Sequence, residues 1–268
     1  MNSYWLFNGL AWVAASALWM RRGRRFAMPW GALVDGVVFS FPAAMVAAHV
    51  WTVAVTEIMR ANWRHSLLTI SGWTWGYTSI GAVAGVALTL VLVARLHRLP
   101  LGLVLDVAGP TVFVASILGR VACFLNGCCF GSPCSLPWAV SFTTGAGSME
   151  SAVARHPVQV YEILLSGTFL VLLPVWQKRW RLVIGSGSVF LVCIAMYMGT
   201  RLTLETLRAG HSSPVLAAGL TYTQWVCAPA LTICLLLLWA GHRRRPLGRG
   251  HGPGSATLKD IRTPGTHT

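Results

Sequence analysis

Seven long apolar stretches follow one another along the chain, and short polar connections separate them. A helix needs about 20 predominantly apolar residues to cross the hydrocarbon core of a bilayer, and these stretches have that length. They show no period-2 alternation of apolar and polar residues, which excludes a transmembrane barrel. We therefore predict an all-α integral membrane protein with seven transmembrane helices. The predicted helices cover 4–20, 33–55, 76–94, 101–125, 158–176, 182–200 and 215–240.

The composition supports this class. Hydrophobic residues make up 55% of the 268 residues and charged residues only 10%, which is too apolar for a soluble domain of this size. The formal net charge of +14 would suggest nucleic-acid binding if it lay on one surface. The basic residues instead form short clusters between the apolar stretches, so we interpret them as topology signals and expect no nucleic-acid partner.

The basic clusters also predict the orientation of the chain. Four of them fall in alternate connections, at 21–25, 95–98, 178–181 and 243–249, and the other connections carry fewer basic residues. Because cytoplasmic loops are enriched in Lys and Arg, we expect the N-terminus outside and the C-terminus in the cytoplasm. Residues 1–247 then form the seven-helix membrane domain. Residues 248–268, rich in Gly, Pro, Ser, Thr and His, are predicted to be a disordered cytoplasmic tail.

Arg120 lies inside the fourth apolar stretch, within the segment ILGRVACFLNGCCFG that covers 117–131. A buried arginine in a membrane span is costly, so it persists where it faces protein, a water-filled cavity or an anion. Its guanidinium matches phosphate with two parallel hydrogen bonds, which favours a buried anion site. The alternative is an arginine that reaches out to the bilayer interface. After Asn126, the backbone amides of the turn from Gly127 to Gly131 could point at the same anion.

Two further polar groups interrupt apolar sequence. In HPVQVYE, Pro157 suits the first turn of a helix, and Gln159 and Glu162 then share one helix face. Ordinary capping at the membrane interface is the alternative for this pair. The second group is spaced by four, four and three residues, which places it along one helix face where the sixth stretch ends. It consists of Tyr197, Arg201, Glu205 and Arg208.

Cysteines are concentrated in one region. Four of the seven form the pattern C-x4-C-C-x4-C, at Cys123, Cys128, Cys129 and Cys134. Zinc sites usually contain cysteine pairs separated by two residues, so this pattern indicates a metal site only weakly, and we predict no metal and no cofactor. A disulfide in an oxidising compartment or a reactive thiol also remains open. The other three cysteines lie inside apolar stretches and are expected to serve in packing.

Four segments taken in order, GRVACFLNGCCFG, HPVQVYE, YMGTRLTLETLRAG and GLTYTQW, resemble the prolipoprotein diacylglyceryl transferase family. The resemblance implies a multi-pass enzyme of the bacterial plasma (inner) membrane. Such an enzyme transfers the diacylglyceryl group of phosphatidylglycerol to the lipobox cysteine thiol of a preprolipoprotein, the first step of bacterial lipoprotein maturation. Its implied partners are phosphatidylglycerol, the preprolipoprotein signal peptide and membrane lipid.

The resemblance also implies roles for individual residues. Arg120 and Arg201 match the two essential arginines of the family and are expected to hold the departing phosphate, with Glu162 as the third catalytic residue. Glu162, His156 and Tyr4 are all candidates to orient groups or to transfer a proton, and the sequence does not choose among them. The remaining expected substrate-binding residues are Tyr4, Asn126, Gly131, His156, Gln159, Tyr161, Tyr197, Glu205 and Arg208.

Three positions depart from the family pattern. Ile80 replaces the histidine of a His-Gly-Gly stretch, Cys123 stands where many members have asparagine, and Cys128 stands where many have an acidic residue. These departures leave an alternative, a non-catalytic or retargeted member that binds lipid or metal through its cysteine cluster. A thiol-redox protein is a third possibility.

Overall fold

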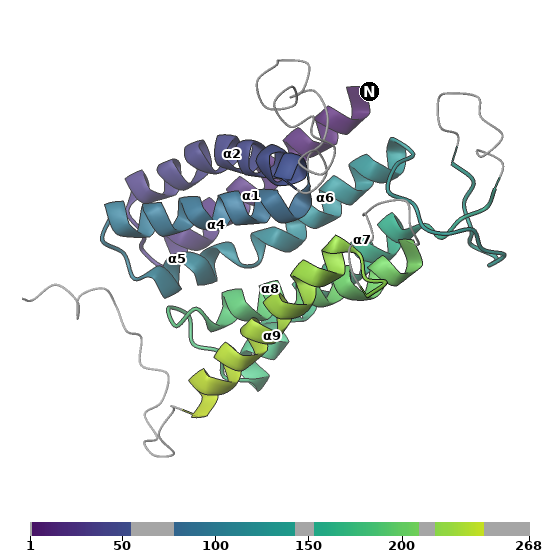
Figure 1. Cartoon of the computed structure of the whole chain (residues 1–268). Coiled ribbons are helices and arrows are strands. Elements are labelled where there is room, and N and C mark those ends of the chain that lie inside the picture. Colours follow the sequence, from purple (N-terminus) through teal and green to yellow (C-terminus); the bar gives the residue numbers. More distant parts are fainter. Residues whose placement is uncertain (1, 55–77, 143–152, 209–217, 244–268) are drawn as a thin grey trace, which may run out of the picture.

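A computed structural model describes residues 2–54, 78–142, 153–208 and 218–243. The predicted tail, 248–268, lies outside the described residues. Helices dominate the described part, as Figure 1 shows, so the predicted all-α class is confirmed. The helices are α1 (Asn2–Arg25), α2 (Trp30–Thr52), α4 (Ser79–Leu96), α5 (Leu101–Ala108), α6 (Thr111–Leu125), α7 (Val158–Arg179), α8 (Ser188–Glu205), the 3-10 helix η4 (Thr206–Arg208) and α9 (Tyr222–Arg243).

Six helical segments of the described chain are long and apolar enough to cross a membrane. They are α2, α4, α5 with α6, α7, α8 with η4, and α9. The first predicted span, in α1, does not belong to this set, because asparagine and serine residues interrupt its apolar sequence. The fourth predicted span, 101–125, is divided at Gly109 and Pro110, where proline cannot donate a backbone hydrogen bond.

Small residues allow α2 and α4 to pack closely. A Cβ atom on Gly81 would lie 2.6 Å from the carbonyl oxygen of Ala47, and one on Gly85 would meet the carbonyl of Ala43. The two glycines are four residues apart and therefore lie on one face of α4. The backbones of the two helices thus approach to a distance that side chains at these positions would prevent.

Two aspartates connect elements that are distant in the sequence. Asp106 in α5 accepts hydrogen bonds of 2.9 Å from backbone N–H groups at the start of α8, including those of Gly187 and Phe190. It therefore caps a helix far away in the sequence, where the helix dipole favours a negative charge. Asp35 lies inside α2 and pairs with His97 at 2.7 Å.

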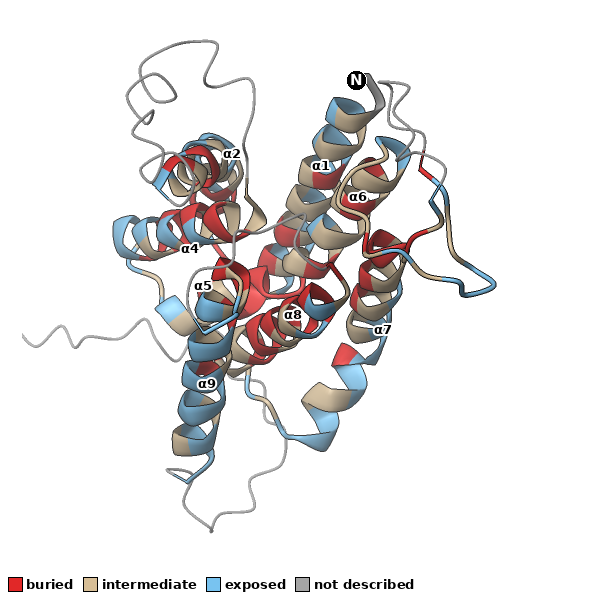
Figure 2. Cartoon of the chain, turned by 45° about the vertical axis from the view of Figure 1, so that its right-hand side comes forward, coloured by how far each residue is buried: buried red, intermediate tan, exposed pale blue. Residues whose placement is uncertain are grey.

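The distribution of polarity is that of a membrane protein. Large apolar side chains are exposed on the outer faces of the helices, for example Leu88, Val171 and Leu236. Buried residues face one another inside the bundle in Figure 2, and arginine and glutamate side chains are among them. Since exposed apolar surface of this extent requires lipid and buried charge requires partners, the chain is a multi-pass membrane protein.

Candidate active site

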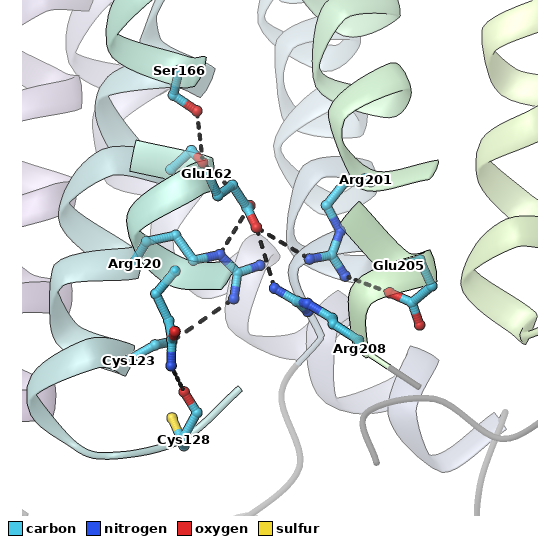
Figure 3. A network of polar contacts seen from close by, with 10 residues as sticks. Arg120, Cys123, Cys128, Glu162, Ser166, Arg201, Glu205 and Arg208 are labelled. Atoms are coloured by element: carbon cyan, nitrogen blue, oxygen red, sulfur yellow. Dashed lines mark hydrogen bonds and ion pairs between the residues drawn. The ribbon is translucent and has the colours of Figure 1, made fainter. Parts of the chain in front are cut away.

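Glu162 is at the centre of a buried cluster of charges near one end of the bundle. Only 1% of Glu162 is exposed. Its Oε1 atom lies 2.9 Å from Nε of Arg120, and its Oε2 atom lies 3.2 Å from an amino nitrogen of Arg208. An amino nitrogen of Arg201 lies 3.5 Å from the same Oε2 atom. Figure 3 shows these three guanidinium groups converging on one carboxylate.

Four elements supply this cluster. Arg120 comes from the last turns of α6, Glu162 from the second turn of α7, Arg201 from α8 and Arg208 from η4. Pro157 precedes α7 directly, and its fixed φ suits the start of the helix that carries Glu162. Every one of these charged side chains is buried. The predicted association of Arg120, Glu162 and Arg201 is therefore present in the structure.

The cluster carries an excess of positive charge. Glu205 adds a second carboxylate, with Oε2 4.0 Å from Arg201, so two negative groups face three guanidinium groups. Nε of Arg201, Nε of Arg208 and both carboxylate oxygens of Glu205 are buried without a hydrogen-bond partner in the described structure. Buried polar groups are normally satisfied, so the unpaired donors indicate a place where a ligand or water is received. An oxyanion fits both the donors and the net charge.

Two serines support Glu162, and the sequence analysis did not identify them. The hydroxyl of Ser116 donates to Oε1 of Glu162 at 3.5 Å, and the hydroxyl of Ser166 donates to Ser116 at 3.2 Å. Ser116 precedes Arg120 by four residues, and Ser166 follows Glu162 by four. That spacing places each serine on the same helix face as its charged neighbour, and it is the signal that could have revealed them.

Three thiols lie directly beside Arg120. The sulfur atoms of Cys123, Cys128 and Cys129 are all within 4.8 Å of one another. An amino nitrogen of Arg120 lies 4.0 Å from the sulfur of Cys123. Cys134 does not belong to this group, so the four-cysteine cluster that the sequence suggested is a three-cysteine cluster in the folded chain. The pKa of Cys129 is lowered, because the thiols of Cys123 and Cys128 donate hydrogen bonds to its sulfur.

The turn after α6 differs from our expectation for its backbone amides. Gly127 has a φ of +62°, and its N–H donates to Phe124 at 3.1 Å, while the N–H of Cys128 donates to Cys123 at 3.0 Å. These two bonds form a Schellman motif, which ends a helix by satisfying its last carbonyls. The N–H of Gly131 donates instead to the carbonyl oxygen of His156, at 2.9 Å. The prediction that these three amides point at an anion is therefore wrong.

Gly131 and Gln159 hold the turn in place. A Cβ atom on Gly131 would lie 2.7 Å from Cβ of His156 and 2.8 Å from the carbonyl of Leu207, so only glycine fits between them. The side-chain amide of Gln159 is fully buried and donates to the carbonyl oxygen of Cys128 at 2.6 Å. Both residues therefore position the cysteine turn against α7 and η4.

The other predicted site residues are spread around this centre. Tyr197 is buried and interacts electrostatically with Arg120 and Arg201, and Tyr4 on α1 interacts with Arg120. Asn126 is exposed at the end of α6. The charged cluster thus has one tyrosine close to it on α8, which also carries Arg201, and one on a further helix, α1.

His156 and Tyr161 form a separate pair. Nδ1 of His156 lies 3.4 Å from the hydroxyl of Tyr161, which also accepts a hydrogen bond of 2.8 Å from Trp138. Neither residue is among those that contact Glu162 in Figure 3. The structure therefore groups these two predicted residues with the loop before α7.

Arg155 is a buried arginine in the loop before α7. Its guanidinium carbon lies 4.9 Å from the centre of the Phe130 ring. Its backbone exchanges two hydrogen bonds with Val140, of 3.0 and 3.1 Å. The sequence contains no local signal for this burial, because it results from contacts between two loops.

Comparison with known proteins supports the resemblance. A sequence model of the prolipoprotein diacylglyceryl transferase family matches residues 1–240. Similar curated proteins are named phosphatidylglycerol–prolipoprotein diacylglyceryl transferase. The one from Paracidovorax citrulli is 34% identical over 186 residues, which cover 68% of this chain and 66% of the relative. The one from Rhizobium meliloti is 32% identical over 174 residues, which cover 65% and 60%.

A relative with the same name from Frankia alni is matched over more of the chain. It is 28% identical over 252 residues, which cover 92% of this chain and 64% of the relative. The chain thus spans less than two thirds of the length of these relatives.

Proposed function

This chain belongs to the prolipoprotein diacylglyceryl transferase family, and from that premise we propose that it transfers the diacylglyceryl group of phosphatidylglycerol to the lipobox cysteine of a preprolipoprotein. In this reaction the thiol sulfur attacks the glycerol carbon that is bonded to a phosphate oxygen. A carbon–sulfur bond forms, the carbon–oxygen bond breaks, and glycerol phosphate departs with the bonding electrons. The thiol proton passes to a base or to water.

The observation that carries this proposal is the excess positive charge around Glu162. Arg120, Arg201 and Arg208 come within 3.5 Å of its carboxylate, and the charge that they leave unbalanced matches one phosphodiester. Negative charge accumulates on the departing phosphate in the transition state, and fixed donors in a poorly hydrated site stabilise it there. Arg120 and Arg201 are the proposed phosphate clamp.

Glu162 is the proposed positioning group of this clamp. It contacts Arg120 through Nε, and one amino nitrogen of that guanidinium faces Cys123, which leaves the other amino nitrogen for the phosphate. Holding the guanidinium groups before the substrate arrives removes the cost of ordering them during the reaction. Tyr4, Tyr197 and Glu205 are proposed to contact the lipid headgroup around the clamp, whereas Asn126, His156 and Tyr161 are proposed to contact the incoming peptide from the loop side.

We further propose that α1 is the seventh membrane span, that the N-terminus lies outside, and that the chain resides in the bacterial plasma membrane. Four helices support this orientation, because α1, α4, α7 and α9 each carry basic residues in their last turn. The charged cluster lies at the opposite ends of the helices, near the end of α6 and the start of α7. The positive-inside rule then places the site toward the outer leaflet, where exported preprolipoproteins arrive.

The second candidate function is a retargeted family member whose acceptor is not a lipobox cysteine. The observation that favours it is the group of three thiols, two of which occupy positions where many members have asparagine or an acidic residue. The two candidates differ in the acceptor and share the lipid.

The deciding experiment incubates the purified full-length protein with phosphatidylglycerol and a lipobox peptide, and detects the thioether-linked product by mass spectrometry. Arg120→Ala is expected to abolish the product. Arg95→Ala is the matched control, because Arg95 is an exposed arginine at the opposite end of the helices. If wild-type protein forms no product under conditions where the Paracidovorax citrulli relative does, the proposed acceptor is wrong.

A further inference from the structure

We propose that Cys123, Cys128 and Cys129 bind one zinc ion through three thiolates, and that the fourth coordination position of this ion receives the acceptor thiol. The part that concerns the acceptor rests on the proposed function, whereas the metal site does not. Neither the family name nor the names of the relatives imply a metal.

The distances between the sulfur atoms fit such a site. All three lie within 4.8 Å of one another. Tetrahedral zinc with bonds to sulfur of about 2.3 Å requires its thiolates to be separated by about 3.8 Å. The group therefore needs a contraction of about 1 Å at most, which small rotations of cysteine side chains can provide.

A helix-ending turn and a positive φ at Cys129 bring the three sulfur atoms together. Cys123 lies in the last turn of α6, and the Schellman motif folds the chain back so that Cys128 returns to it. Cys129 has a φ of +63°, a conformation that is costly for any residue except glycine and that persists only where the surroundings impose it. Gln159 holds the turn through its 2.6 Å bond to the carbonyl of Cys128.

Charge and access also suit a catalytic type of zinc site. Thiolates are favoured by positive neighbours, and an amino nitrogen of Arg120 lies 4.0 Å from the sulfur of Cys123. Cys128 and Cys129 are partly exposed, so a substrate can approach the ion from their side. Among the described residues this group offers three protein ligands, and three protein ligands with one open position distinguish catalytic zinc sites from closed structural ones.

The proposed zinc site lies where it could hold the acceptor thiol next to the phosphate clamp. Arg120 contacts both Glu162, at 2.9 Å, and Cys123, so the proposed phosphate clamp and the thiols are immediate neighbours. An acceptor thiol that binds zinc passes its proton to water and remains a thiolate beside the phosphate-bearing carbon. Its sulfur then forms the new bond to carbon while the phosphate oxygen departs. The zinc ion keeps its oxidation state, so no oxidant or reductant is needed.

The first experiment measures metal binding without any substrate. Full-length protein, purified in detergent with a reductant, is titrated with Co²⁺ and separately analysed for zinc. We expect one ion per chain and the thiolate-to-cobalt charge-transfer absorption of a tetrahedral site. Cys128→Ser and Cys129→Ser should each weaken binding by at least ten-fold, whereas the matched control Cys134→Ser should bind as the wild type does. Elution as a single species and an unchanged thermal midpoint establish that each variant is folded.

Two results would overturn the metal site. One is wild-type protein that binds neither ion while all three thiols react with a maleimide. The other is a disulfide between any two of the three cysteines that persists in the reductant.

The second experiment tests the open position. A lipobox peptide added to the cobalt-loaded protein should change the absorption by introducing a fourth sulfur ligand, and the same peptide with serine in place of cysteine should not. An unchanged spectrum contradicts the role proposed for the acceptor, whether or not the protein is active. If cobalt and peptide bind but no lipidated product forms, the metal site stands and the proposed transferase reaction fails.

Discussion

Nε of Arg120 lies 2.9 Å from Oε1 of Glu162, and this contact joins α6 to α7 inside the bundle. The same guanidinium also lies 4.0 Å from the sulfur of Cys123. One arginine therefore connects the carboxylate that gathers the positive charges with the group of thiols. The experiments below separate the contribution of each partner.

Replacing Glu162 by Gln should destabilise the protein strongly. The change keeps the size of the side chain but leaves three buried guanidinium groups with only the more distant carboxylate of Glu205. Removing one partner of a buried ion pair costs about 3–5 kcal/mol, so the thermal midpoint in detergent should fall by many degrees. Glu205→Gln is the matched control, and its effect should be smaller because its contact to Arg201 is 4.0 Å long. Equal decreases of the thermal midpoint in the two variants would contradict the inference that Glu162 is the main partner of the three arginines.

Replacing Arg120 by Lys should reduce transfer by about 100-fold, the scale on which the loss of one transition-state donor acts. Lysine keeps the charge but cannot contact Glu162 and a phosphate at the same time through a planar fork. The measurement is the rate of formation of the thioether-linked product from phosphatidylglycerol and a lipobox peptide. Arg95→Lys, at the far end of α4, should leave the rate unchanged. A fully active Arg120→Lys variant would show that only the charge matters.

Replacing Gly131 by Ala should displace the cysteine turn. The new methyl group would meet His156 at 2.7 Å and the carbonyl of Leu207 at 2.8 Å, and overpacking of this kind costs about 1–3 kcal/mol. Gly167→Ala is a matched control, since no atom lies within 4 Å of its added Cβ and α7 should gain up to about 1 kcal/mol there. The thermal midpoints of the two variants should therefore move in opposite directions.

Replacing Ser116 by Ala should lower activity more than stability. The hydroxyl of Ser116 donates to Glu162, and losing one such hydrogen bond costs about 1 kcal/mol. If the carboxylate then turns away from Arg120, the transition state loses about the same free energy, which corresponds to a several-fold decrease in the transfer rate. Ser40→Ala is a suitable control, because within the described residues the hydroxyl of Ser40 bonds to its own helix, at the carbonyl of Val37. Unchanged transfer in the Ser116 variant would show that the arginines alone orient Glu162.

The proposed orientation predicts which residues react from outside the cell. A membrane-impermeant maleimide applied to intact cells should label Cys134, which is partly exposed after α6. A cysteine introduced by Trp180→Cys, beyond the other end of α7, should be labelled only after permeabilisation. Mass spectrometry of the labelled peptides identifies the modified residue. The opposite pattern would reverse the orientation.

Much of the fold could be predicted because membrane insertion depends on local hydropathy. The described ranges of α2, α4, α7 and α9 lie within a few residues of the predicted stretches, except at the start of α9. Gly109 and Pro110 divide the fourth stretch, because proline cannot donate a backbone hydrogen bond. The helix α1 does not belong to the spanning set, because asparagine and serine residues interrupt its apolar sequence.

The candidate site could be predicted in its residue types but not in its pairings. Tyr197, Arg201, Glu205 and Arg208 were expected as one polar stripe, yet Arg208 lies in η4 and pairs with Glu162 of another helix. Cys134 was grouped with three cysteines from which the folded chain separates it. Asp106 lies in α5 and caps α8, a contact that no local sequence pattern indicates.

The sequence by itself determined that the chain is helical and membrane-embedded, to which family it belongs, and that its charges within apolar segments must find partners. These properties follow from the composition of short segments, since the cost of placing each residue in lipid is largely a local sum. Only the tertiary structure decided that one carboxylate holds three arginines and that three thiols meet beside one of them. Such meetings depend on how helices distant in the sequence pack and in which register, and no local segment contains that information.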